Sequence, residues 1–161
     1  MKYILYVHVL LILVACQQRS KDTTNLQQKI DSLQTELANS YRPGFGEFMS
    51  SIQAHHIKLW FAGQQKNWEL ADFEVHEIRE NLDDIRLYQA DRKESKATQM
   101  LEPVLDSVIQ SINRKDPVAF TRTYYQLTNT CNTCHRENDF GFNVVTIPTS
   151  QPFSNQDFSS H

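Results

Sequence analysis

Two cysteines and a histidine stand close together near the end of the chain, in the order Cys131-Asn132-Thr133-Cys134-His135. Residues three apart on a helix lie on one face, so both thiols can reach one flat molecule while His135 turns its imidazole toward the centre of that molecule. The C-x-x-C-H order is typical of c-type haem attachment. We therefore expect one haem c per chain, bound covalently by Cys131 and Cys134, with His135 as the proximal iron ligand.

Three other interpretations of this motif were weighed. A redox C-x-x-C pair normally accompanies a βαβ pattern, and no such pattern is present. A structural zinc site needs four ligands, so a distant histidine such as His55 or His56 would have to join the three motif residues. A chance pair of buried cysteines would leave the adjacent histidine unexplained. Haem attachment accounts for all three residues together.

The first 15 residues have the pattern of an export signal. Lys2 precedes an apolar run that ends at Ala15, and this run is too short for a membrane-spanning helix, which needs about 20 residues. The end of the run, Leu13-Val14-Ala15-Cys16, resembles a bacterial lipobox, in which the cysteine becomes the lipidated first residue. We expect an exported protein, lipid-anchored through Cys16 and facing the periplasm. Because Gln17 is not the aspartate that signals inner-membrane retention, the outer membrane is favoured in a Gram-negative host.

The composition narrows the range of functions. The chain has 16 basic and 19 acidic residues and a net charge of −3, and it lacks the basic patch or stripe expected of a nucleic-acid-binding protein. All three cysteines have a chemical assignment, at Cys16, Cys131 and Cys134, which leaves none for a structural disulfide. No acid and base pair stands beside the haem motif, so we expect a protein that is not an enzyme.

The apolar spacing after Tyr41-Arg42-Pro43-Gly44 predicts four helices. Pro103 should kink or restart the third, and Asp116-Pro117 should provide the N-cap and first position of the fourth. Four helices of this length with short polar connections predict an all-α fold, an antiparallel four-helix bundle. The expected helices cover about residues 45–62, 68–88, 93–113 and 116–138.

Two further segments flank the predicted bundle. The N-terminal one carries Leu26, Ile30, Leu33 and Leu37 at coiled-coil spacing over about two heptads. This seam could mediate homo-oligomer formation through residues 26–37, or it could pack on its own domain. The C-terminal segment is apolar enough to pack across the bundle in an extended conformation. The chain is thus expected to comprise a signal peptide (1–15), a tether (16–42), a haem-binding bundle (43–140) and an extended tail (141–161).

The chain resembles the cytochrome c-prime family and its low-spin relatives, four-helix-bundle cytochromes with C-x-x-C-H near the end of the last helix. The motif closes the fourth predicted helix here in the same way. Over about residues 44–158 the chain is also similar to a set of exported cytochrome-like haem proteins, through Gly46-Glu47-Phe48-Met49 and the segment from His56 to Gly63. The long apolar tail after the motif departs from ordinary cytochrome c-prime.

The resemblance implies that the sixth iron ligand comes from the first helix, running antiparallel to the fourth. Facing positions then have numbers that sum to roughly 180, which makes Met49 the candidate opposite His135. His56 lies on the same seam about 10 Å further along the axis and is the alternative sixth ligand if the helices are offset. It could instead hydrogen-bond a haem propionate or a neighbouring helix, and the sixth position could also be open. His55 lies one position off the seam and is expected to be exposed.

These residues predict a membrane-anchored one-electron carrier that exchanges electrons with redox partner proteins at the membrane. A six-coordinate iron changes oxidation state with little rearrangement, and a His/Met ligand pair raises the reduction potential relative to two histidines. The alternative is a haem-based gas-binding or sensing protein, in which an open sixth site takes nitric oxide or carbon monoxide.

Overall fold

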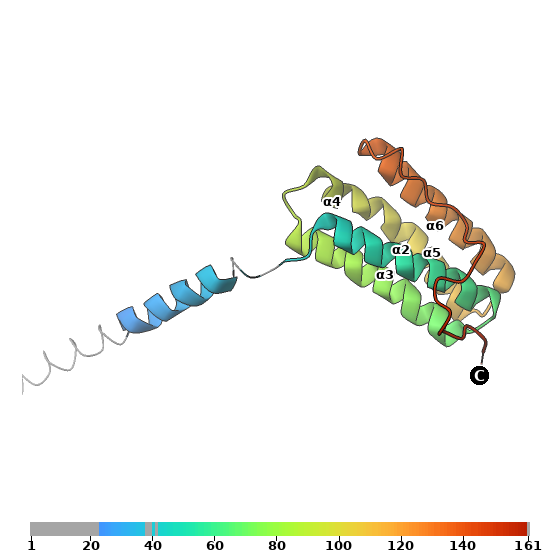
Figure 1. The fold of residues 1–161 in the computed structure, drawn as a ribbon, viewed down its shortest axis with the longest axis horizontal. Helices are drawn as coiled ribbons and strands as arrows, with labels where there is room; N and C mark the ends of the chain where they lie inside the picture. Colours follow the sequence, from blue (N-terminus) through green and yellow to red (C-terminus); the bar gives the residue numbers. More distant parts are fainter. Residues whose placement is uncertain (1–22, 38–39, 41, 161) are drawn as a thin grey trace, which may run out of the picture. The chain divides into compact units, whose positions relative to one another are not determined.

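The computed structural model describes residues 23–37, 40 and 42–160. The chain divides between Arg42 and Pro43 into two units. The regular structure of the described residues is entirely helical, with no β-strand among them (Figure 1), which confirms the all-α fold class. No helix in the described ranges is long and apolar enough to cross a membrane. The predicted signal and the candidate lipidation site Cys16 lie outside the described residues.

In the N-terminal unit, residues 23–37 form a helix. A hydrogen bond of 2.9 Å from the side-chain amide of Gln27 to Asp31, one turn later, supports it. The apolar seam predicted for this segment lies on the helix surface and is exposed. Its members are Leu26 (60% exposed), Ile30 (40%), Leu33 (63%) and Leu37 (67%).

The second unit begins with α2 (Phe45–Gln64) and α3 (Trp68–Tyr88). The Glu47 carboxylate accepts a hydrogen bond from the Gly44 backbone N–H at 2.6 Å, which satisfies a free donor at the start of α2. α2 includes Gly63, just beyond the predicted end of the helix. The ring of Phe120 packs where a side chain on this residue would stand. Gly63 therefore serves close helix packing and does not end the helix.

The third predicted helix is divided into three pieces. α4 (Lys93–Ala97) leads into a short 3₁₀ helix, η1 (Thr98–Leu101), and then into α5 (Glu102–Asn113). Pro103 stands in the first turn of α5, where its missing N–H costs nothing because that position has no intrahelical acceptor. The proline therefore restarts the helix, one of the two outcomes expected for it.

The last helix, α6 (Pro117–Glu137), begins where the sequence predicts. The Asp116 carboxylate accepts hydrogen bonds from the backbone N–H groups of Val118 and Ala119, both at 3.0 Å. This arrangement is an N-cap with proline at the first helical position.

The long helices of the second unit share one core. α2 packs on α3 and α6, and α5 also packs on α3 and α6. Phe48 is buried, whereas Phe45 is only partly buried. The apolar residues lie on one face of each helix, which buries their surface between the helices. The largest fully buried apolar residues are Leu59, Ile78, Leu82, Ile85, Leu105, Phe120, Tyr124, Leu127 and, from the tail, Phe158.

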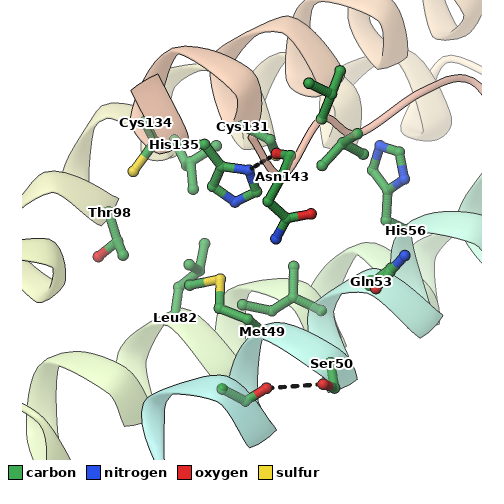
Figure 2. A pocket seen from close by; sticks show the side chains of 15 residues that line it. Met49, Ser50, Gln53, His56, Leu82, Thr98, Cys131, Cys134, His135 and Asn143 are labelled. Atoms are coloured by element: carbon green, nitrogen blue, oxygen red, sulfur yellow. Dashed lines mark hydrogen bonds between the residues drawn. The ribbon is translucent and has the colours of Figure 1, made fainter. Parts of the chain in front are cut away.

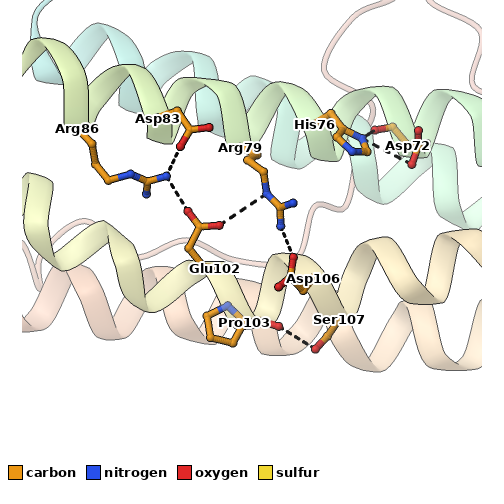
Figure 3. A network of polar contacts seen from close by, with 9 residues as sticks. All are labelled: Asp72, His76, Arg79, Asp83, Arg86, Glu102, Pro103, Asp106 and Ser107. Atoms are coloured by element: carbon orange, nitrogen blue, oxygen red, sulfur yellow. Dashed lines mark hydrogen bonds and ion pairs between the residues drawn. The ribbon is translucent and has the colours of Figure 1, made fainter.

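Ion pairs join α3 to α5 along an outer edge of this core (Figure 3). Arg86 donates to Glu102 at 2.7 Å and also pairs with Asp83 on its own helix. Arg79 donates to Asp106 at 2.5 Å and lies 3.7 Å from Glu102. These side chains are partly exposed, so each pair contributes little energy and mainly orients the two helices.

The C-terminal tail turns back after α6 at Asp139, whose φ of 69° is left-handed, and runs along the helices (dark red in Figure 1). It has no regular secondary structure, yet Phe158 is buried in the core, 1% exposed, beside the ring of Phe61. Near the end of the tail, the Asn67 side chain donates to the Ser159 carbonyl at 2.8 Å. The tail thus packs across the helices, as expected from its composition.

Candidate functional site

The last turns of α6 bring Cys131, Cys134 and His135 to one cavity of about 240 Å³ (Figure 2). α2 supplies the opposite wall, and the tail closes one side with residues 143–145. A second cavity of about 270 Å³ adjoins it and shares part of its lining. The residues common to both cavities are Gly46, Met49, Cys134, His135 and Asn143. The structure therefore gathers all three motif residues, together with Met49, around one space.

One nitrogen of His135 is held by the tail. Nδ1 lies 2.6 Å from the backbone carbonyl oxygen of Asn143, and because a carbonyl can only accept, Nδ1–H is the donor. The neutral ring then carries no proton on Nε2. An imidazole whose Nδ1–H is bound to a backbone carbonyl is the arrangement typical of a metal-ligating histidine.

Both motif thiols are free. Cys134 is buried, and its backbone carbonyl accepts a hydrogen bond of 2.8 Å from the Asn138 side chain. Cys131 is partly buried and lines the cavity, and burial raises the pKa of its thiol to about 12. Burial also raises the pKa of Cys134. Both sulfurs are therefore neutral thiols at neutral pH.

Met49 projects from α2 toward His135 across the cavity (Figure 2). The structure thus places Met49 and His135, which were predicted to face each other, around one cavity. One turn earlier on α2, Gly46 faces the same space, and no atom lies within 4 Å of where its Cβ would stand. The α2 side of the cavity is therefore open and carries a soft sulfur donor.

His56 also lines the cavity, but its ring is engaged elsewhere. It is 3% exposed, with Nε2 hydrogen-bonded to the Thr128 hydroxyl and Nδ1 to the Tyr124 hydroxyl, both at 2.9 Å. Burial lowers its pKa to about 4, so the ring is neutral. Figure 2 shows the ring turned away from His135. Of the roles considered for His56, the structure favours hydrogen bonding to the neighbouring helix α6.

The expectation that His55 is exposed is wrong. Its side chain is 15% exposed, and Nδ1 lies 2.6 Å from the carboxylate of Glu74, which is itself 1% exposed. Lys58 also approaches Glu74, with 3.7 Å between Nζ and Oε1. α3 therefore presents a buried carboxylate that its apolar spacing did not reveal, and a buried charge needs partners. This draws His55 and Lys58 to the interface between α2 and α3.

The zinc alternative needed His55 or His56 as a fourth ligand, and both have other partners. Among the described residues, no group of three or more histidine, cysteine, aspartate or glutamate side chains is arranged to hold a metal ion. Apart from the hydrogen-bonded His56, the nitrogen and sulfur donors of the titratable and thioether side chains at the cavity are the His135 imidazole, two thiols and a thioether. These are donor types that attach and ligate a c-type haem.

Two asparagines at this site had no expected role. Asn143 supplies the carbonyl that binds His135. The Asn132 side chain forms two hydrogen bonds of 2.8 Å with Val145, donating to its carbonyl and accepting from its N–H. The only sequence signal for Asn132 is its place inside the motif, and haem attachment itself does not restrict that position.

Comparison with protein-family models, curated proteins and solved structures gave no match. The resemblance to the cytochrome c-prime family therefore stays a prediction.

Proposed function

We propose that this protein is a monohaem c-type cytochrome that carries one electron. Cys131 and Cys134 would hold the haem covalently and His135 would bind its iron. The observation that carries the proposal is the shared cavity. All three motif residues line it, and because Nδ1–H of His135 is bound to the Asn143 carbonyl, Nε2 is the nitrogen left to bind a metal. Bound there, the haem supplies a reversible one-electron change at iron.

The site fits this group in size and in donor chemistry. Pockets for small molecules begin at about 300 Å³, and the two adjoining cavities, of about 240 and 270 Å³, share five lining residues. The walls include the apolar side chains of Ile52, Leu82 and Leu101. Apolar walls disfavour the extra positive charge of ferric iron and so would raise the reduction potential.

The proposed architecture is an antiparallel four-helix bundle formed by α2, α3, α5 and α6. The contacts of α2 and α5 with both α3 and α6 support it. So does the pairing of Met49 near the start of α2 with His135 near the end of α6, because antiparallel helices bring such positions together.

Met49 is the proposed sixth ligand. Its thioether faces His135, whereas His56 would have to give up a hydrogen bond to bind iron. Held between two residues on packed helices, the iron would change charge with little movement of its ligands, which suits electron transfer. Lipid at Cys16 would keep the carrier at the periplasmic side of a membrane, with the outer membrane favoured in a Gram-negative host, where redox partner proteins can reach it.

The test is the optical spectrum of the protein matured with haem, in ferric and ferrous forms, for the parent, Met49→Ala and His56→Ala. Met100→Ala is the matched control, because Met100 is also partly buried but does not line either cavity. We expect covalent haem by mass, low-spin bands in the parent, and a high-spin spectrum for Met49→Ala alone.

The other outcomes are equally informative. A high-spin spectrum confined to His56→Ala would make His56 the ligand. A high-spin parent that binds carbon monoxide would overturn electron transfer in favour of gas binding. Absence of covalent haem from the parent would overturn the whole proposal.

A further inference from the structure

The tail is attached to the haem motif at two points that share one geometry. Asn132 and His135 are three residues apart on α6 and therefore lie on one face of the helix. Their partners, Val145 and Asn143, are two residues apart on the tail. Only Val144 separates these two residues, so neither can shift along α6 without moving the other. The two attachments therefore belong to one register of the tail against α6.

The Asn132 side chain is suited to set this register. A carboxamide offers one acceptor and a donor pair, as a peptide group does, and it satisfies both backbone groups of Val145 at 2.8 Å. A slip of the tail by one residue would carry these backbone groups about 3–4 Å away from the Asn132 side chain. The Asn143 carbonyl would then no longer meet Nδ1 of His135.

We propose that Asn132 is a positioning residue for the proximal ligand: it locks the tail so that the Asn143 carbonyl holds His135 in one tautomer and orientation. This inference deepens the proposed function and rests on it for its redox consequence, but the lock itself does not depend on haem. The tail would thus influence the iron through its hydrogen bond to His135, and Asn132 would do so without being a ligand itself.

The chemical effect has a definite direction. A hydrogen bond from Nδ1–H to a carbonyl increases the basicity of the ligating nitrogen, and a more basic ligand stabilises ferric iron more than ferrous. Weakening that bond raises the reduction potential. It also leaves the neutral imidazole free to place its proton on either nitrogen.

The test compares Asn132→Ala and Asn132→Asp with Thr133→Ala in the full chain. Thr133 is the matched control because it is the other residue between the two cysteines, and its hydroxyl bonds Asn129 and Arg136 on α6 itself. Three quantities are measured: hydrogen exchange of the Val145 amide, the tautomer of His135 from ¹⁵N chemical shifts of the full chain before haem is loaded, and the reduction potential of the haem-loaded protein.

We expect exchange at Val145 to accelerate about tenfold in Asn132→Ala, as for the loss of about 1.4 kcal/mol of protection. His135 should lose its exclusive Nδ1–H tautomer and the potential should rise. Asn132→Asp keeps the acceptor for the Val145 N–H and loses the donor. Its effects should therefore lie between those of the parent and Asn132→Ala, or equal those of Asn132→Ala. Thr133→Ala should match the parent in all three quantities.

Parent-like exchange at Val145 in Asn132→Ala would show that the lock does not exist. Faster exchange with an unchanged His135 tautomer and potential would show that the lock does not reach the ligand, which also overturns the inference. If the parent takes up no haem, the proposed function fails, while exchange and tautomer still decide whether Asn132 positions His135.

Discussion

His56 illustrates how a single buried residue can carry both structural and pH-dependent behaviour. Its two nitrogens contact hydroxyls of α6, and the Tyr124 hydroxyl also donates to the His56 carbonyl at 2.8 Å. The residue thus joins α2 to α6 one or two turns away from the haem motif. Because burial lowers its pKa, the cost of protonating it appears as a loss of stability in acid.

We expect the free energy of unfolding to fall as the pH falls from about 6.5 to about 4. In that window the unfolded chain binds a proton at His56 that the folded chain does not, so acid favours unfolding, by about 3 kcal/mol in total. Denaturant unfolding at several pH values measures it. His56→Gln should remove this part of the slope and the exposed His76→Gln should retain it; equal slopes in the parent and His56→Gln would contradict the assignment.

Among the helices, α6 contributes most to the candidate site. Its C-terminal turns contain the C-x-x-C-H motif, and side chains in its middle hydrogen-bond His56 of α2. Its start is defined by local chemistry, with the Asp116 carboxylate bound to two backbone N–H groups. Its end is defined by the left-handed Asp139 and the returning tail. The motif therefore lies where a helix meets an irregular segment, which lets a backbone carbonyl reach His135.

Asp116→Ala should lower the free energy of unfolding by about 1 kcal/mol, within the range measured for removed N-caps. The reason is that the Val118 and Ala119 N–H groups lose their acceptor, while the C-terminal turns of α6 keep their packing. Thermal or denaturant unfolding gives the magnitude, and the haem spectrum should stay unchanged. Asp116→Asn retains a capping oxygen and should cost less; an equal loss in both variants would indicate that charge, and not capping, is responsible.

For the whole molecule, the described residues around the two main cavities all belong to the second unit, between Phe45 and Val145. The N-terminal unit contributes a helix with an exposed apolar seam. Under the proposed function, the second unit would therefore bind haem without help from the first.

A variant that keeps the export signal but lacks residues 17–42 should therefore show the same ferric and ferrous spectra as the parent. Self-association through residues 26–37, if it occurs, should be lost, which sedimentation velocity of the two proteins in detergent would detect. The double variant Ile30→Ser, Leu33→Ser is the control for deleting the seam without shortening the chain. A changed spectrum in the shortened protein would show that the first unit contributes to the haem site.

Features that depend on neighbours along the chain could be predicted from the amino-acid sequence. The C-x-x-C-H spacing, the cap at Asp116 and the helical periods all involve residues within a turn or two of each other, so local geometry constrains them. The restart at Pro103 is of the same kind. The pairing of Met49 with His135 needed one thing more, the antiparallel first and last helices that the resemblance to cytochrome c-prime implies, after which the rise per residue gave the facing positions.

Contacts between segments that are distant in the sequence became known only from the folded chain. In the sequence, Glu74 belongs to a helix with many acidic side chains, and nothing local distinguishes it from them. In the folded chain it is buried against His55. His56 finds its partners on α6, and His135 meets a carbonyl of the tail. Such contacts depend on how side chains from several segments fill one interior. The apolar periodicity of a helix predicts which of its faces is buried, but not which residues of other segments contact that face.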